Sequence, residues 1–348
     1  MASGLGVLLL LLMVPAGMVA WSWWKLQRPY QGYPGRERQV TIAPGTPASQ
    51  ILQILEREGV LADAKLARSY LIYYMRDPKM QAGEYLFRGP MTTSQVLSML
   101  VRGQTLTHGF TLVEGMTLEE TADQLAREGF GRREVFLDLM RSPQLIADLD
   151  PDAPDLEGYL FPETYSFASG TREREIVETL VRTFRRRFDK SVRPLLPQGP
   201  PGRSVRQVVT LASIVEKEAK MSNERPLIAA VYQNRVSRKI GLAADPTVIY
   251  ALKRLGRWNG NLTREDLRME SPYNTYRWAG LPPGPICSPG LASLTAATAP
   301  ADVPYLYFVG RNDGTHVFAE TLAEHNRNVE IWQRQYWRDQ RRRTGAGR

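Results

Sequence analysis

The sequence has very little cysteine and histidine. Its one cysteine, Cys287, excludes an internal disulfide, and neither a C-x-x-C pair nor a tight His/Cys cluster is present to bind structural zinc. Of the three histidines, His316 and His325 lie near a predicted strand-to-helix turn, where we expect hydrogen bonds that hold the fold. We therefore expect neither a metal site nor a cofactor.

Signatures of nucleic-acid binding are also missing, although the 348-residue chain has a formal net charge of +9. Much of the positive charge lies in Arg185-Arg186-Arg187 and in the tail from Arg334 to Arg348. A basic surface of this kind can meet an acidic polymer or anionic lipid. Because no RNA- or DNA-binding module accompanies the charge, we do not expect a nucleic-acid partner.

One long apolar run lies near the N-terminus. Residues Leu5 to Ala20 are almost unbroken apolar sequence, and Trp21, Trp23 and Trp24 follow at once. Tryptophan prefers the membrane interface, and no small-x-small cleavage site precedes the first of them, so we predict an uncleaved anchor over residues 1–28 and a linker over 29–37. Basic residues follow the span and not the short N-terminal tail, which by the positive-inside rule favours a cytoplasmic body.

Hydrophobic periodicity after the linker predicts a small unit of strands and helices. The expected elements are a strand at 39–42, helices at 48–58 and 64–75, a strand at 83–87 and a helix at 93–102. The strand-turn-helix pattern then recurs at an offset of 70, since 40–45 matches 110–115 and 55–59 matches 125–129. The shared offset implies two related units, the second over 106–150.

The remaining sequence predicts a larger, mainly helical region. Expected helices span 133–140, 172–188, 204–220, 224–238, 247–253, 288–298 and 322–337, with a hairpin over 305–318. Asp245-Pro246 and Ser288-Pro289 are predicted to cap two of these helices. The fold class that follows is α+β.

The helix at 204–220 carries the strongest chemical signal. Ser204 and Gln207 form a capping-box pattern, the next turns are apolar on nearly every side, and Glu216 and Glu218 lie near the C-terminal end. At about 100° per residue the two carboxylates point in roughly opposite directions, so one of them faces a given cleft. A desolvated carboxylic acid stays protonated near neutral pH and can act as a general acid. We favour Glu218 and keep Glu216 as the alternative.

Three loops combine aromatic and polar residues, as a saccharide groove requires. They are Glu157 to Tyr165, Asp245 to Thr247, and Tyr273 to Tyr276. Such side chains offer hydrogen bonds to hydroxyls and flat faces to sugar rings.

These motifs resemble those of the endolytic murein transglycosylases (YceG-like), in the same order. The segments are EGYLFPETY from Glu157, ASIVEKE from Ala212, DPTVIY from Asp245, YNTY from Tyr273, GLPPG from Gly280 and PYLYFV from Pro304. The resemblance covers roughly Arg38 to Trp332 and implies a LysM-like subdomain over 38–105 and a catalytic domain over 106–337. The basic tail over 338–348 falls outside the resemblance. It also implies a bacterial inner-membrane protein with its body in the periplasm, which overrides the charge argument on orientation.

The resemblance implies a lyase that cleaves MurNAc-GlcNAc bonds in nascent glycan strands and leaves 1,6-anhydro-MurNAc ends. The family's catalytic glutamate maps onto Glu218, and we assign substrate contacts to Glu163, Asp245, Tyr273 and Asn274. Hydrogen bonds from Tyr273 or Asn274 to an acetamido group would orient the sugar. Expected partners are glycan strands and the peptidoglycan synthases of the elongation or division machinery.

Two alternatives stay open. A muramidase would use water and a second carboxylate, such as Glu163 or Asp245, and would leave reducing ends. A non-catalytic scaffold of the cell-wall synthesis machinery would bind glycan through the LysM-like subdomain.

Overall fold

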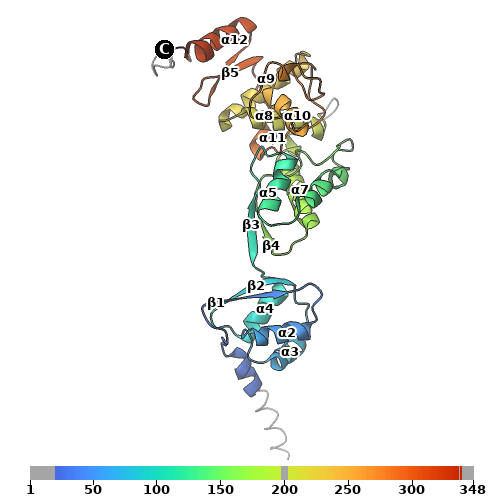
Figure 1. Ribbon diagram of the computed structural model, residues 1–348, viewed down its shortest axis with the longest axis vertical. Helices are drawn as coiled ribbons and strands as arrows, with labels where there is room; N and C mark the ends of the chain where they lie inside the picture. The colour runs from blue at the N-terminus through green and yellow to red at the C-terminus, as the bar shows by residue number, and fades with distance from the viewer. Residues whose placement is uncertain (1–19, 197–202, 337, 339–348) are drawn as a thin grey trace, which may run out of the picture. The chain divides into compact units, whose positions relative to one another are not determined.

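The computed structural model describes residues 20–196, 203–336 and 338, which form two compact units. The first unit runs to Gly109 and includes Ser166–Thr171, and the second contains Phe110–Tyr165 and the chain from Arg172 onward. Figure 1 labels helices and strands of both units. The fold is mixed α+β, as predicted.

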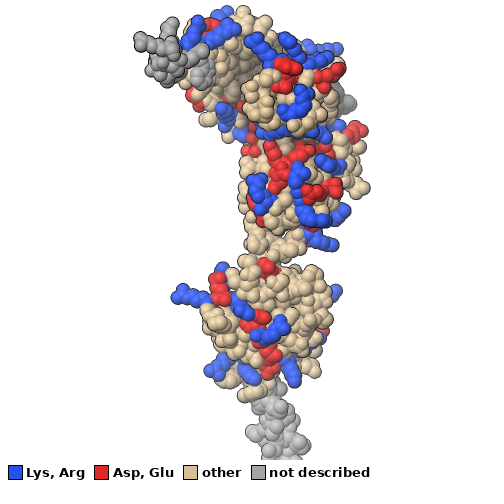
Figure 2. All heavy atoms as spheres, viewed as in Figure 1, with Lys and Arg blue, Asp and Glu red and all other residues tan. Residues whose placement is uncertain are grey.

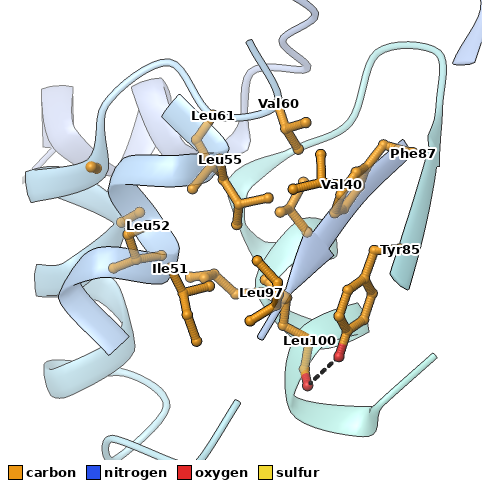
Figure 3. Close-up of a cluster of buried hydrophobic side chains, with 14 of the residues drawn as sticks. Val40, Ile51, Leu52, Leu55, Val60, Leu61, Tyr85, Phe87, Leu97 and Leu100 are labelled. Carbon is orange, nitrogen blue, oxygen red and sulfur yellow. Dashed lines mark hydrogen bonds between the residues drawn. The ribbon is translucent and has the colours of Figure 1, made fainter. Parts of the chain in front are cut away.

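The first unit packs helices on one face of a two-stranded sheet. Strand β1 (Glu37–Ile42) pairs antiparallel with β2 (Gly83–Arg88), and the helices are α2 (Ala48–Arg57), α3 (Ala64–Tyr73) and α4 (Thr93–Arg102). Val40 and Ile42 point inward from β1 while Thr41 between them is exposed, which is the alternation of a half-buried strand. Figure 3 shows the core that Val40, Leu52, Leu55 and Phe87 help to form. The predicted order of strands and helices is confirmed.

The strand-turn-helix pattern recurs in the structure with the same offset. Strand β3 (Thr107–Thr111) and helix α5 (Leu118–Arg127) follow β1 and α2 at 70 residues or close to it. The turn glycines correspond as well, because Gly45 has φ of 81° and Gly115 has φ of 82°. Strand β3 pairs with β4 (Thr164–Ala168), which the sequence analysis did not predict as a strand.

The second unit surrounds helix α8 with other helices. Its elements after α5 are α6 (Arg133–Met140), α7 (Glu173–Ser191), α8 (Val205–Glu218), α9 (Arg225–Ser237), α10 (Asp245–Arg254), α11 (Leu291–Thr298), β5 (Tyr307–Gly310), β6 (His316–Ala319) and α12 (Leu322–Val329). Short 3-10 turns lie at Pro143–Ile146, Arg193–Leu195, Ser222–Glu224 and Asp266–Arg268. A π-helical turn, Glu330–Gln335, follows α12.

Helix α8 is the centre of this unit. It packs against α9, α10 and α11, and every residue from Val208 to Val215 is buried. The predicted capping box is present, since the Ser204 hydroxyl accepts from the Gln207 amide at 3.2 Å and the Gln207 side chain accepts from the Ser204 amide at 3.0 Å. A helix buried on all sides and capped at its start positions its C-terminal turn precisely.

Two predicted helix caps are wrong. The N-cap of α10 is Ala244, because Asp245 is already helical and its carboxylate is bonded to Tyr276. The N-cap of α11 is Gly290, which directly follows Ser288-Pro289. For Asp245 a partner distant in sequence, and not the local cap, decides where the side chain goes. The Ser288 hydroxyl is buried and has no hydrogen-bond partner among the described residues.

The predicted membrane anchor lies largely outside the described residues, which begin at Ala20, and so does the basic tail apart from Arg338. Within the described part of the chain, no helix has both the length and the apolar character needed to cross a membrane.

Candidate active site

Glu218 occupies the last turn of α8, and its carboxyl group is largely removed from water. Oε1 accepts a hydrogen bond of 2.9 Å from the hydroxyl of Tyr232 on α9. Burial raises the pKa of Glu218 to about 7, the negative charge of Asp245 raises it as well, and the hydrogen bond from Tyr232 opposes both. A substantial fraction of this group is therefore protonated near neutral pH.

An exposed carboxylate and an exposed phenol lie near Glu218. The Tyr276 hydroxyl donates to Oδ1 of Asp245 at 2.5 Å, and the charge of Glu218 is among the influences that raise the pKa of Tyr276. Asp245 begins α10, while Tyr276 lies on the loop that precedes α11. Three segments of the second unit therefore converge on one acid, and two of them present groups that a polar ligand can reach.

Glu216 faces a different part of the unit. Its side chain is buried, with Oε1 3.1 Å from Nη2 of Arg225 and Oε2 accepting from the Gly290 amide at 2.9 Å. Arg225 also donates to Ser222 and Ser293. The two carboxylates of α8 point to different neighbours, as the helical geometry predicts, and Glu216 joins α8 to α9 and α11.

The predicted substrate residues differ in what they can reach. Asn274 is fully buried, its amide donates to the carbonyl groups of Leu267 and Met269, and its Oδ1 accepts from the Tyr276 amide. This side chain is therefore not open to an acetamido group, contrary to our expectation. Its hydrogen bonds fold the loop that presents Tyr276.

Two other predicted residues make mainly structural contacts. Glu163 accepts a hydrogen bond from Arg187 of α7, and its backbone carbonyl accepts from the Leu112 amide at 3.1 Å. The ring of Tyr273 packs against Tyr250, with the ring centroids 5.0 Å apart. Of the four residues, Asp245 is the one that the structure links to Glu218.

Tyr232 and Trp278 have no role predicted from the sequence, although the structure gives both a distinctive position. Tyr232 bonds the acid directly, and the only signal for it was its place on the helix after α8. Trp278 is 52% exposed and lines a hollow of about 370 Å³ with Pro272, Leu281 and Pro283. A tryptophan two residues after Tyr276 adds to the aromatic residues of this loop, and that position was the one signal for it in the sequence.

Glu157 is a second carboxyl group with an unusual environment. It is fully enclosed in the second unit, where its oxygens accept from the Leu118 amide at 3.1 and 3.2 Å and from the Tyr250 hydroxyl at 3.2 Å. Burial raises its pKa to about 8. Because these contacts join the start of α5 to α10, the group holds two helices together.

Among the described residues, His316 makes a contact that holds the fold together. The ring of His316 is 2.7 Å from Oε2 of Glu224, which ties β6 to the start of α9. No group of three or more His, Cys, Asp or Glu able to hold a metal occurs in the part of the chain that the structure describes.

Basic and acidic side chains are interspersed on the face shown in Figure 2. That face has no continuous basic stripe of the kind that follows a nucleic-acid backbone.

The fold and this site define a class: an α+β protein with one desolvated carboxylic acid at the end of a buried helix. The chain belongs to the YceG-like family, whose model matches residues 40–331. A relative from Bacillus subtilis (strain 168) is 32% identical over 307 residues, which are 84% of this chain and 83% of that protein. It is named endolytic murein transglycosylase.

Further comparisons agree. A Streptococcus pneumoniae protein (serotype 2, strain D39) with the same name is 30% identical over 321 residues, which cover 83% of this chain and 57% of that longer protein. The crystal structure of a putative yceG-like protein from Listeria monocytogenes matches with a TM-score of 0.56 and 33% identity. The match covers 84% of this chain and 99% of the Listeria chain.

Proposed function

We propose that this chain is an endolytic murein transglycosylase, a carbon-oxygen lyase that cleaves MurNAc-GlcNAc bonds in nascent glycan strands. It belongs to the YceG-like family, and relatives 30% and 32% identical over most of its length have that name. The observation that carries the mechanism is the desolvated carboxyl of Glu218 with its bond to Tyr232.

A lytic transglycosylase needs one carboxyl group that acts first as an acid and then as a base. Protonated Glu218 donates its proton to the glycosidic oxygen while the bond from C1 of MurNAc to that oxygen breaks. The resulting carboxylate takes the proton from the C6 hydroxyl of the same sugar as O6 bonds to C1. The products are a 1,6-anhydro-MurNAc end and a free GlcNAc hydroxyl, and no water is consumed.

The hydrogen bond from Tyr232 assigns the two oxygens of Glu218 to different tasks. Oε1 accepts from the phenol, so the transferable proton belongs on Oε2, which then faces the glycosidic oxygen. When the proton has left, the same hydrogen bond stabilises the new carboxylate. Asp245 supplies a negative charge that favours the oxocarbenium-like transition state.

The residues proposed to contact the substrate are those whose side chains are exposed. Asp245, Tyr276 and Trp278 are exposed, and their polar and aromatic groups suit hydroxyls and sugar ring faces. Tyr273 and Asn274 shape the same loop from within. Glu163, which is held by Arg187, is a support of the fold in this mechanism.

The first unit would bind glycan and the N-terminal run would anchor the protein. A hollow of about 320 Å³ lies between the β1–α2 turn and the α3–β2 connection, with Gly45, Thr46, Asp77 and Lys79 in its wall. Its mixed polar and apolar lining supports a LysM-like glycan-binding role.

The apolar residues 5–20 support a single-span anchor in the bacterial inner membrane with a periplasmic body, close to the synthases whose product it cuts.

The test is mass spectrometry of the products formed from purified glycan strands by wild type, Glu218→Gln and the matched control Glu134→Gln on exposed α6. We expect anhydro-MurNAc ends from wild type and the control and none from Glu218→Gln. Reducing ends in place of anhydro ends would favour the muramidase alternative. Glycan binding without any product would favour the scaffold.

A further inference from the structure

The first unit exposes several large aromatic side chains on its N-terminal helical segment and on α3. We call these residues the aromatic surface, and they are Trp21, Trp23, Trp24, Tyr73 and Tyr74 with the half-buried Tyr70. Tyr73 is 81% exposed, and Trp21 and Trp24 are each 57% exposed. Apolar patches of this kind on a folded domain indicate a binding surface.

The aromatic surface is built from two segments that pack together. Residues 20–27 form a helical segment whose Trp23 ring lies 5.2 Å from the Tyr74 ring and 6.3 Å from the Tyr70 ring. Tyr70 and Tyr74 stack on each other at 5.2 Å. A hollow of about 230 Å³ between the two segments is lined mainly by apolar and aromatic side chains, together with two serines. The tryptophan segment is therefore docked on α3 (Figure 1).

Cationic groups lie next to the exposed rings. Nζ of Lys25 is 4.9 Å from the centre of the Trp21 ring, and the guanidinium of Arg28 is 5.3 Å from the Trp24 ring. Tryptophan and tyrosine favour the headgroup level of a bilayer, and Lys and Arg beside them reach anionic phosphates. The aromatic surface therefore has two features of a protein segment at a lipid interface: exposed tryptophan and tyrosine rings, and cationic side chains beside them.

The apolar residues that precede the described part of the chain are continuous in sequence with the aromatic surface. The apolar run from Leu5 to Ala20 leads directly into Trp21, so a membrane-embedded run would deliver the bilayer to the aromatic surface. We propose that the aromatic surface docks the first unit onto the bilayer, with tyrosines of α3 among the headgroups alongside the tryptophans. This inference rests on the proposed anchor and adds to it, because α3 lies far along the sequence from the apolar run.

The experiment uses the full chain in vesicles of phosphatidylethanolamine and phosphatidylglycerol. A thiol is placed at Tyr73→Cys on the aromatic surface, or at Thr41→Cys as a control, and labelled with an environment-sensitive maleimide dye. Thr41 is exposed on the face of β1 opposite to Val40 and Ile42, which pack against the helices. The native Cys287 is buried and does not compete for the label. Brominated lipids then report contact with the bilayer.

We expect a blue shift at Tyr73→Cys and quenching several-fold stronger than at Thr41→Cys. Replacing Trp23 by Ser in the same chain should weaken the quenching at Tyr73→Cys, because the helical segment then loses its stack on α3. Equal, weak quenching at both positions in a chain that floats with the vesicles would overturn the docking and leave the anchor intact. A chain that does not float would refute the anchor itself. A blue shift that appears in detergent and grows with protein concentration would place a second copy on the surface and overturn the proposal.

Discussion

The phenol of Tyr232 lies 2.9 Å from Oε1 of Glu218, and the two side chains come from adjacent helices, α9 and α8. Their packing is rigid, since Tyr232 is buried and meets Phe308 edge to face with ring centroids 5.8 Å apart. The hydrogen bond therefore has a fixed geometry, and its removal should have a defined effect.

Tyr232→Phe should raise the pKa of Glu218, because the hydrogen bond lowers that pKa in the wild type. In the proposed mechanism Glu218 must be protonated to start the reaction, so the alkaline limb of the kcat/KM profile should move to higher pH. The maximal rate should fall about tenfold, since the carboxylate formed during the reaction loses its donor. Measuring kcat and kcat/KM as a function of pH gives both the shift of the limb and the fall in the maximal rate. Tyr85→Phe, which loses a buried hydroxyl in the first unit, should leave the profile unchanged.

Asp245→Asn should shift the same limb in the opposite direction. The negative charge of Asp245 raises the pKa of Glu218, and the amide removes that charge while keeping the shape of the side chain. The alkaline limb should therefore move to lower pH. Asp266→Asn, which changes an exposed carboxylate bonded to Thr263, is the control. A limb that stays in place after Asp245→Asn would mean that Asp245 does not act on Glu218 electrostatically.

Glu216→Gln should reduce stability and leave the products unchanged. The substitution removes the charge that pairs with buried Arg225 at 3.1 Å. Losing one member of a buried pair costs on the order of 3 kcal/mol, because the other charge stays buried. Chemical denaturation measures the loss, and the folded fraction should still produce anhydro ends.

The double variant Glu216→Gln, Arg225→Gln checks the cause of that loss. If the pair is responsible, the two changes together should cost less than the sum of the single changes. Additive losses would show that Glu216 acts through Gly290 alone.

Glu157→Gln should flatten the dependence of stability on pH. Burial raises the pKa of this carboxyl to about 8 in the folded state, against an ordinary value of 4.5, so between these values the folded state holds a proton that the unfolded state has released. Stability contributed by this group is therefore present at low pH and is lost as pH rises through that window. The loss is on the order of 5 kcal/mol over the full window.

Urea denaturation at pH 5 and pH 8.5 tests this. The wild type should be markedly less stable at the higher pH, and Glu157→Gln should show a smaller difference, because an amide does not ionise. Glu134→Gln on the exposed side of α6 should behave like the wild type. An unchanged difference in Glu157→Gln would assign the pH dependence to other groups, Glu218 first among them.

Local sequence signals predicted the helices well, because capping and periodicity act within one turn. The Ser204–Gln207 box and the bounds of α4 are examples. Helical geometry also predicted that Glu216 and Glu218 face different neighbours. The identity of those neighbours could not be predicted, since Arg225 and Tyr232 reach α8 only through the packing of α9.

The features that the sequence did not predict correctly depend on contacts between residues that are far apart in the chain. Strand β4 forms because β3 is there to pair with it, and the hydroxyl groups of Thr111 and Thr164, 3.0 Å apart, are 53 residues apart in sequence. Asp245 looked like a helix cap because its true partner, Tyr276, lies 31 residues further along. Asn274 looked like a ligand residue because its sequence does not reveal that it is buried.

The two turns that follow β1 and β3 have the same backbone and different neighbours. A side chain built on Gly45 would meet nothing within 4 Å, and the turn borders a hollow. The matching Gly115 donates to the Ser288 carbonyl at 2.8 Å, and its own carbonyl accepts from Lys217 beside the acid. If one ancestral module was duplicated, the copy in the first unit kept an open turn that can receive a ligand. The other copy closed the same turn on helix α8 and became part of the support for that helix.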